Sequence, residues 1–258
     1  MDVHTAATAP ALRIRYIGHA TTLVELDGVR LLTDPVLRRS VAHLRALQRA
    51  PTAAELGRID AALVSHAHWD HLDVRSLRLL GLDTRLIVAA ATLPWLRRRG
   101  FRREVEAVEI GDEVAVGPVV VRATPAVHGK PDAAVGFLYR GSSTVYFAGD
   151  TDVFPEMDAI ADTIDVALLP IWGWGPSLGP GHMDPEGALE AVRLLRPRIV
   201  IPIHWGTLHP IGMAKRSFLT EPPRTFRRLV EEQVPDVEVM IVPPGGEVVL
   251  PVVRAAPG

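Results

Sequence analysis

One six-residue stretch carries the densest chemistry of the chain, and it reads His66-Ala67-His68-Trp69-Asp70-His71. It follows the apolar run 61–64, so we expect a buried strand that ends near Ser65 and delivers these residues to a loop at the sheet edge. Residues two apart in extended backbone point the same way, so His66 and His68 can hold one cation. The stretch therefore predicts a metal site at the end of a strand.

The second half of this stretch indicates a second cation. A helix is predicted over 73–80 with Asp73 as its N-cap, and the turn toward it lets Asp70 and His71 face another ion a few ångströms away. The alternative is a polar turn of hydrogen-bonded histidines. Buried polar groups at this density are costly without a metal or water to satisfy them, so we favour metal binding.

Three more candidate ligands stand after predicted strands, where loops converge at a sheet edge. They are His128 after 119–124, Asp150 after 144–148 and His204 after 199–203. Each alone is more typical of a helix cap or a satisfied buried histidine. Together with the stretch at 66–71, they predict a shared metal centre.

Composition limits the chemistry that this centre can use. The chain has no cysteine, which excludes disulfides, thiolate nucleophiles, iron–sulfur clusters and every cysteine-containing zinc site. Any metal must therefore be held by histidine and carboxylate. The formal net charge of −2 gives no global attraction to nucleic acid, so we expect none as a partner.

Length and hydropathy predict a single soluble domain. The 258 residues fit one core, over about 12–253, preceded by a flexible start at 1–11. We find neither a secretory signal pattern nor the ~18 apolar residues of a membrane span. We therefore expect a cytoplasmic protein with no stable membrane insertion.

Hydrophobic patterns predict a mixed α/β (α+β) fold, with two mixed sheets face to face and helices outside. Strands are predicted at 12–17, 21–26, 29–33, 61–65, 86–90, 119–124, 135–139, 144–148, 166–170, 199–203, 237–242 and 247–252. Asp27-Gly28 is a hairpin signal between the second and third of these strands. Further helices are predicted at 94–99, 185–195 (opened by Asp184) and about 223–231.

Together these motifs resemble the metallo-β-lactamase-fold hydrolases, and more closely the N-acyl-phosphatidylethanolamine phospholipase D and ascorbate-phosphate lactonase-like branch. The resemblance spans about residues 12–232 and implies a four-layer αββα sandwich. Besides the stretch 66–71, it rests on Gly18-His19-Ala20-Thr21, Thr33-Asp34-Pro35, Phe147-Ala148-Gly149-Asp150-Thr151, His182-Met183-Asp184-Pro185-Glu186, Ile203-His204-Trp205-Gly206-Thr207 and Glu221-Pro222-Pro223, in that order.

The resemblance implies a ligand set for two divalent metal ions per chain. One ion would be held by His66, His68 and His128, the other by Asp70, His71 and His204, with Asp150 bridging both. Nitrogen and oxygen ligands without thiolate suit zinc, and also manganese or iron. Two such ions ~3.5–4 Å apart would generate a bridging hydroxide as nucleophile.

Three other residues have predicted roles around this centre. We expect Asp34 to orient a ligand histidine through its second ring nitrogen, although a turn-forming aspartate is the alternative. His182 is predicted to contact substrate or protonate the leaving group, and we expect both His182 and Asp70 to be catalytic. For His19 we favour a structural histidine bonded to backbone. His43 matches no motif and receives no role.

An aromatic pocket wall is predicted from tryptophans beside the motif residues. Trp69, Trp172 and Trp174 are assigned to substrate binding, with core packing as the alternative for each. Lys130, two residues after His128, is assigned to an anionic substrate group, with a solvent-facing lysine as the alternative. The arginines at 97–103 are expected to be a solvated helix end rather than a phosphate site.

The leading functional hypothesis is hydrolysis of a phosphodiester in a small or lipid-derived anionic substrate. A lactonase or esterase of the ascorbate-phosphate lactonase-like type is the nearest alternative. Alternatives of another class are a mono-iron oxygenase and a non-catalytic metal-binding protein. The sequence specifies no oligomeric state, and relatives of this fold are often dimers or larger, so a homo-oligomer is among the options.

Overall fold

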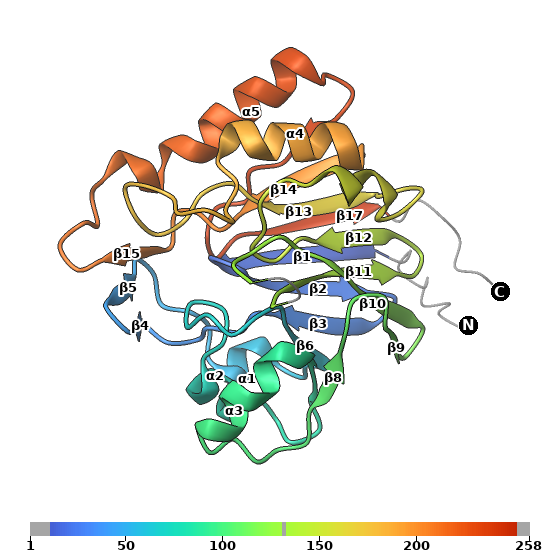
Figure 1. The fold of residues 1–258 in the computed structure, drawn as a ribbon, viewed down its shortest axis with the longest axis vertical. Coiled ribbons are helices and arrows are strands. Elements are labelled where there is room, and N and C mark those ends of the chain that lie inside the picture. Colours follow the sequence, from blue (N-terminus) through green and yellow to red (C-terminus); the bar gives the residue numbers. More distant parts are fainter. Residues whose placement is uncertain (1–10, 131–132, 252–258) are drawn as a thin grey trace, which may run out of the picture.

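Alternation along β6 (Ala61–Val64) creates the two faces of a sheet. Ala61 and Leu63 pack into the core between two sheets, whereas Ala62 and Val64 pack under helices on the opposite face. Side chains of successive strand residues point to opposite faces, so an unbroken apolar strand is buried on both. In the computed structural model, which describes residues 11–130 and 133–251, this pattern gives two face-to-face sheets with helices on their outer sides (Figure 1).

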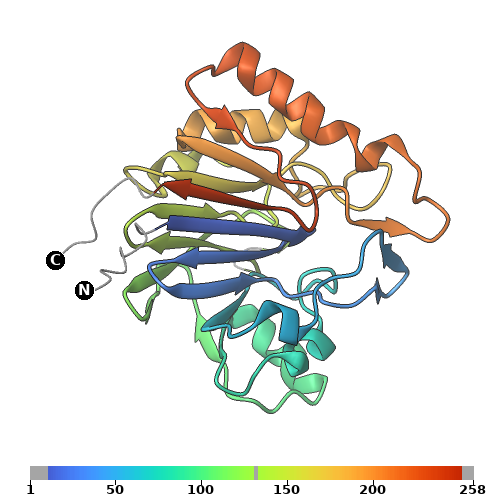
Figure 2. The ribbon, with the colours of Figure 1, turned by 180° about the vertical axis from the view of Figure 1, so that it is seen from behind.

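The first sheet has seven strands, and the last described strand forms one of its edges. Figure 2 shows β17 lying beside β1 at this edge. In spatial order the strands are β17 (Glu247–Pro251), β1 (Ala11–Gly18), β2 (Thr21–Leu26), β3 (Val29–Thr33), β6, β7 (Arg85–Ala89) and β8 (Glu106–Val108). The Asp27-Gly28 hairpin predicted between β2 and β3 is confirmed, with φ of 50° and 80° at its two turn residues.

The second sheet also has seven strands and supplies the other half of the central core. In spatial order they are β16 (Glu238–Val239), β14 (Ile199–Ile203), β13 (Val166–Pro170), β12 (Thr144–Phe147), β11 (Val135–Arg140), β10 (Val119–Pro125) and β9 (Glu113–Val116). The strand predicted at 237–242 is wrong in length, because only two residues of it pair with β14. Short β9 was not predicted.

Helices gather at opposite ends of the molecule in Figure 1, each set covering one sheet. The first sheet is covered by α1 (Ala53–Leu56), α2 (Val74–Leu79) and α3 (Leu93–Arg98), and the second by α4 (Pro185–Leu195) and α5 (Glu221–Gln233). The predicted N-caps are confirmed: Asp73 accepts from the Ser76 amide, and Asp184 accepts from the Gly187 amide. The four-layer sandwich expected from the resemblance is therefore present.

A small third sheet packs against Trp69 and Trp174 and was not predicted. It contains β4 (Ser40–Val41), β5 (Leu44–Ala46) and β15 (Leu208–Pro210), and Figure 1 shows it projecting from the sandwich. These strands have only two or three residues, too few to show an alternating pattern. Three 3₁₀ turns complete the described elements: η1 (Ala90–Thr92), η2 (Pro155–Ala159) and η3 (Ser217–Leu219).

Strand direction brings distant residues to one edge of the sandwich. In the first sheet β3 runs parallel to β6, and in the second sheet β12 runs parallel to β13 and β14. The loops that follow the carboxyl ends of these strands therefore lie together, which is where open α/β sheets bind ligands.

The predicted domain limits fall at the ends of the described region. The flexible start predicted for 1–11 lies outside the described residues except for Ala11, which opens β1, and the predicted end at 252–253 also lies outside them. None of the helices in residues 11–130 and 133–251 is long and apolar enough to cross a bilayer.

Candidate metal centre

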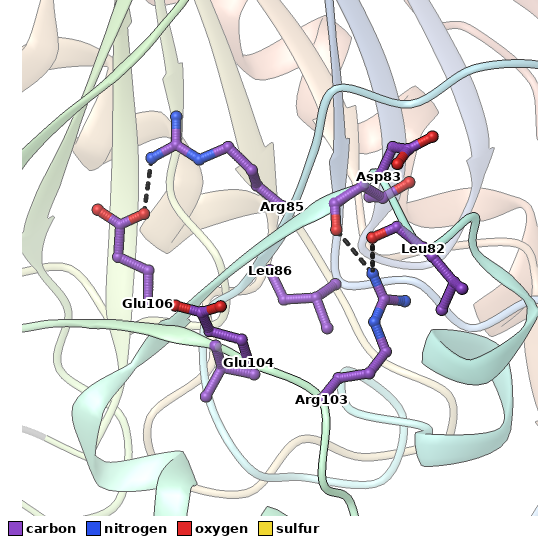
Figure 3. Close-up of a pocket in the computed structure, with 9 residues that line it drawn as sticks. Leu82, Asp83, Arg85, Leu86, Arg103, Glu104 and Glu106 are labelled. Carbon is purple, nitrogen blue, oxygen red and sulfur yellow. Dashed lines mark hydrogen bonds and ion pairs between the residues drawn. The ribbon is translucent and has the colours of Figure 1, made fainter.

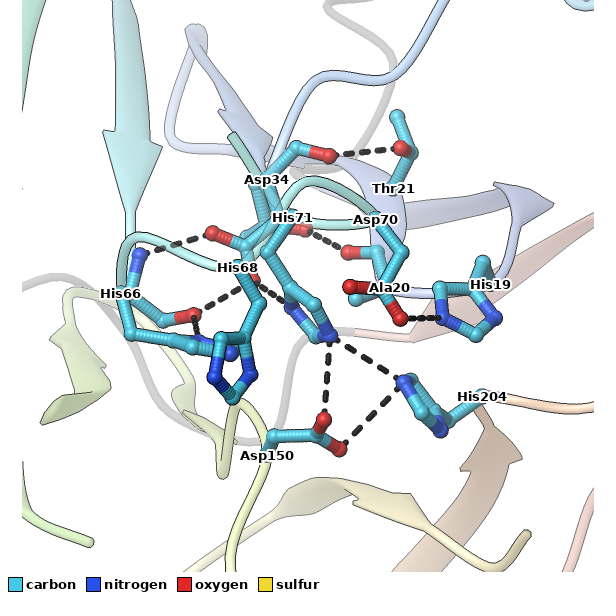
Figure 4. Close-up of polar contacts among 12 residues, drawn as sticks. His19, Ala20, Thr21, Asp34, His66, His68, Asp70, His71, Asp150 and His204 are labelled. Atoms are coloured by element: carbon cyan, nitrogen blue, oxygen red, sulfur yellow. Dashed lines mark hydrogen bonds and ion pairs between the residues drawn. The ribbon is translucent and has the colours of Figure 1, made fainter. Parts of the chain in front are cut away.

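The predicted ligands come together at the carboxyl edge of the two sheets. His66 to His71 follow β6, Asp150 follows β12, and His204 follows β14 (Figure 4). His128 comes from the loop after β10. All of these side chains are buried except His68, which is exposed. The centre therefore opens to solvent on the side of His68.

Asp34 and Ser65 fix the orientation of His71. Oδ2 of Asp34 accepts from Nδ1 of His71 at 2.8 Å and from Oγ of Ser65 at 2.6 Å, while Oδ1 accepts from the Ser65 amide at 2.7 Å. Because a carboxylate only accepts, Nδ1 of His71 carries the proton. Nε2 of His71 then presents a lone pair to the centre, as expected for a metal-binding histidine with an oriented second nitrogen.

The same serine orients His66. Because the Ser65 hydroxyl donates to Asp34, its oxygen can accept from Nδ1 of His66 at 3.0 Å. Nε2 of His66 is buried and has no hydrogen-bond partner. An unpaired buried nitrogen is costly, so this atom fits a ligand to an ion in the centre.

Two backbone carbonyls orient two further histidines. Nδ1 of His204 donates to the carbonyl of Trp172 at 2.6 Å, and Nδ1 of His128 donates to the carbonyl of Gly181 at 2.6 Å. Both rings consequently direct Nε2 lone pairs inward. His68 is different, because its Nδ1 faces the centre, 2.9 Å from Nε2 of His128.

The inward-facing nitrogens and carboxylates form overlapping groups of residues that lie close enough together to bind a metal ion. Nε2 of His71 and Nε2 of His204 are 3.1 Å apart, and Asp150 lies 3.2 Å from the former and 3.3 Å from the latter. Lone pairs that face one another require positive charge between them, a proton or a cation. Ligand atoms within 4.8 Å of one another form the groups His66/His68/His128, His66/His71/Asp150, His128/Asp150/His182 and His19/Asp70/His71/His204.

Burial keeps two of the histidines neutral, whereas neighbouring carboxylates keep a third one charged. It lowers the pKa of His204 to about 3 and holds the pKa of His66 well below its usual range. Burial also opposes charge on His71, but the carboxylates of Asp150 and Asp34 outweigh it and hold the pKa of His71 well above its usual range. Without a cation the cluster therefore retains a proton on His71.

Both inner carboxylates are held in the ionised form. Burial opposes ionisation of Asp70, but the hydrogen bond from His19 and the charge of His71 hold its pKa well below the usual range. Burial likewise opposes ionisation of Asp150, and electrostatic attraction to the rings of His204 and His71 outweighs it, so this pKa is also far below normal. Ionised carboxylates among histidine nitrogens suit a hard or borderline divalent cation.

The structure corrects the expectation for His19. Its ring does not bond to backbone: Nε2 lies 3.1 Å from Oδ2 of Asp70, and the ring packs against that of His204 at a tilt of 36°, with centroids 3.7 Å apart. Unlike the four other oriented rings, His19 has no partner on Nδ1. Its φ of 58° is left-handed, a strained conformation that often marks functional sites. The motif Gly18-His19-Ala20-Thr21 was the available signal.

The sequence of this chain matches the model of a known protein family. The family model of the β-lactamase superfamily domain matches residues 29–205. All of the predicted metal ligands lie within that span. The chain belongs to the β-lactamase superfamily. Its predicted fold and family resemblance are thereby confirmed at this level, and the ligand cluster lies within the matched region.

The similarity to individual relatives extends over almost the whole chain. A UPF0173 metal-dependent hydrolase of Thermofilum pendens is 34% identical and covers 93% of this chain and 99% of its own. Igni18, a metallo hydrolase of Ignicoccus hospitalis, has a TM-score of 0.70 at 26% identity and covers 93% and 98%. CmlA, a diiron β-hydroxylase of Streptomyces venezuelae, shares the fold with a TM-score of 0.67 at 21% identity, covering 96% of this chain and 55% of its own.

His182 lies beside the ligand cluster, near the end of the loop that follows β13. Its Nε2 is 3.4 Å from Oδ2 of Asp150, and its Nδ1 faces the carbonyl of Gly179 at 3.1 Å. The side chain is partly exposed. His182 is therefore accessible from outside and within reach of the ligand cluster.

Two of the three tryptophans predicted to form an aromatic pocket wall lie close together, and the third lies elsewhere. Trp69 and Trp174 are partly exposed and lie 6.5 Å apart between ring centroids, and the exposed His43 fills the space between them at 4.8 Å and 5.1 Å. Trp172 instead packs against the central core and donates its Nε1 proton to Gly175. His43 was missed because it stands alone in the unpredicted β4–β5 hairpin.

The side chain of Lys130 is exposed, as the alternative of a solvent-facing lysine predicts. Residues 131–132, which follow it, lie outside the described part. No contact recorded among the described residues places its ammonium in the ligand cluster. The Arg97–Arg103 segment behaves as an ordinary helix end: Arg97 and Arg103 donate to backbone carbonyls, and Arg99 lies over the Trp95 ring.

A cavity of about 550 Å³ lies away from the metal ligands, between β7 and the chain leading to β8 (Figure 3). Its arginines already have protein partners, since Arg85 pairs with Glu106 at 2.6 Å and Arg103 donates to the carbonyl of Thr84 at 2.7 Å. We therefore place the chemistry at the histidine cluster and not in this groove.

Proposed function

We propose that this chain is a dinuclear metal-dependent hydrolase that cleaves a phosphodiester. One observation carries the proposal: Nε2 of His71 and Nε2 of His204 face one another at 3.1 Å, while the opposite nitrogen of each ring donates to a fixed acceptor. Rings oriented in this way are built to give lone pairs to cations. Asp150 lies within 3.3 Å of both nitrogens and 3.9 Å from Nε2 of His128, so it fits a carboxylate shared by the two sites.

The donor set divides into two sites. His66, His68 and His128 would hold one divalent ion, and Asp70, His71 and His204 the other, with Asp150 shared. Two divalent ions bound there would supply Lewis acidity and lower the pKa of a bound water toward neutrality. The residues fit this group because the unpartnered Nε2 of His66 is buried at the site.

Charge balance favours an anionic substrate. Asp34, Asp70 and Asp150 are the carboxylates of the centre, and their three negative charges do not neutralise two divalent cations. The remaining positive charge attracts an anion and stabilises charge that develops on a phosphoryl group during attack. A lactone or other neutral ester lacks the first of these advantages.

Substrate would approach from the side of the exposed His68. Trp69 adjoins this residue, and Trp174 and His43 extend the same aromatic surface, so an apolar part of the substrate can pack there. His182, beside Asp150, is the residue placed to donate a hydrogen bond or a proton to the leaving oxygen.

Hydrolysis of bis(p-nitrophenyl) phosphate, run beside a panel of lactones, tests the proposal. We expect phosphodiester turnover that a chelator removes and that added zinc or manganese restores. Asp150→Asn should abolish it, whereas Asp158→Asn, the same change at an exposed residue of η2, should leave it intact. Turnover of lactones alone would transfer the proposal to that substrate class, and oxygen consumption with bound iron but no hydrolysis would refute it.

A further inference from the structure

Gly181 has no room for a side chain beside one of the ligand histidines. A Cβ on this residue would lie 3.1 Å from Nδ1 of His128 and 3.2 Å from its Cα, and the residue has a φ of +83°. Both the conformation and the close approach therefore require glycine. The close approach is what allows the Gly181 carbonyl to reach Nδ1 of His128 at 2.6 Å.

This carbonyl determines which nitrogen of His128 faces the ion. A carbonyl only accepts, so Nδ1 is protonated and Nε2 is left as a lone pair toward His68 and Asp150, at 2.9 Å and 3.9 Å. Removing the carbonyl would free the ring to rotate or to change its protonated nitrogen. Such outer partners of metal-bound histidines contribute about 10- to 100-fold in metal affinity.

The other end of the same loop supports the other ion. Residues 171–184 connect β13 to α4, and near the start of this loop the Trp172 carbonyl accepts from Nδ1 of His204 at 2.6 Å. His182 follows Gly181 directly and lies 3.4 Å from Asp150. One loop thus supplies the carbonyls that orient one histidine of each proposed site, and it also carries His182, the residue proposed to face substrate.

We propose that Gly181 is a positioning residue for the ion held by His66, His68 and His128, acting through its carbonyl on His128. The inference rests on the dinuclear centre of the proposed function. Because the carbonyl that orients His204 belongs to Trp172, near the opposite end of the loop, a change at Gly181 affects one site and leaves the other able to bind.

Cobalt(II) titration of Gly181→Ala, followed by visible absorption, tests this assignment. We expect one site with wild-type affinity and one weakened by about 10- to 100-fold, together with a changed ligand-field spectrum. Gly179→Ala is the matched control, because that glycine lies in the same loop with open space around it. Gly212→Ala controls for backbone strain alone, since Gly212 has a φ of +90° and nothing near its Cβ position.

Each outcome separates the inference from the proposed function. Wild-type protein that binds fewer than two ions refutes the dinuclear centre itself. Two ions of unchanged affinity in Gly181→Ala, equal weakening of both, or the same loss in Gly179→Ala overturns the role of Gly181.

A second measurement applies if Gly181→Ala does not fold. In zinc-loaded wild-type protein the Nδ1 proton of His128 should give a slowly exchanging NMR signal with a nuclear Overhauser contact to Gly181. A His128 signal from Nε2–H, or one without that contact, overturns the assignment.

Discussion

Oδ2 of Asp34 lies 2.8 Å from Nδ1 of His71, and both side chains are fully buried. The same carboxylate also accepts from Ser65, whose hydroxyl faces Nδ1 of His66. A single aspartate that touches no inward-facing nitrogen therefore orients one histidine directly and a second one through a serine. Its φ of 35° shows that the backbone is held in an unusual conformation to place it there.

Asp34→Asn should weaken metal binding at the His71 site by about 10- to 100-fold and reduce hydrolysis at least as much. The amide can still accept from the Ser65 backbone, but its NH₂ group would face the protons on Ser65 and His71. Metal content after dialysis against limiting zinc measures the effect. Asp158→Asn serves as control, and unchanged affinity in Asp34→Asn would remove the orienting role.

His182→Ala should reduce turnover while both metals stay bound. If His182 protonates the leaving group, the loss should be large, about 10²-fold, for an alkyl phosphodiester and much smaller for a p-nitrophenyl ester, whose leaving group needs no proton. Steady-state rates on the two substrates give the comparison. A missing metal ion in this variant would instead make His182 a ligand.

The stability gained from metal should grow between pH 7 and pH 9. The pKa of His71 is raised in the metal-free fold, so its proton stabilises that fold at lower pH and the stabilisation is lost as pH rises through the raised pKa. His66 and His204, with lowered pKa values, are already neutral in this range. Melting temperatures with zinc and with chelator should diverge as pH rises; a constant or shrinking difference would contradict the charged state assigned to His71.

Two fully buried tyrosines should respond oppositely to loss of the hydroxyl. The Tyr16 hydroxyl donates to the Trp205 carbonyl at 2.7 Å and accepts from its amide, whereas the Tyr139 hydroxyl has no partner among the described residues. Tyr16→Phe should cost about 1–3 kcal/mol of unfolding free energy, and Tyr139→Phe should be neutral or stabilising. Urea unfolding of both variants tests this, and equal losses would show that Tyr139 is satisfied after all.

Local patterns were sufficient to predict the main strands and to single out the residues of the histidine–aspartate cluster. β6 is an apolar run that is followed by four candidate ligands, Asp150 comes three residues after the end of β12, and His204 follows β14 directly. In each case the signal lies within a few neighbouring residues. The periodicity also predicted the N-caps at Asp73 and Asp184, because capping is a local interaction.

Contacts between distant segments could not be predicted in this way. His19 meets Asp70 across 51 positions of sequence, and His43 reaches Trp174 from a hairpin too short to show alternation. The role of Gly181 depends on an approach to His128 that only the folded chain creates. Tertiary contacts between segments without periodicity leave no pattern in the sequence.

Metal content per chain, measured by elemental analysis on protein purified without added metal, tests the central claim most directly. Hydrolysis of bis(p-nitrophenyl) phosphate should be followed on the same sample before and after chelation. The account predicts about two zinc or manganese ions per chain and turnover that disappears with the metal. A single ion per chain, or two ions with no hydrolysis of any phosphodiester or ester tried, would contradict it.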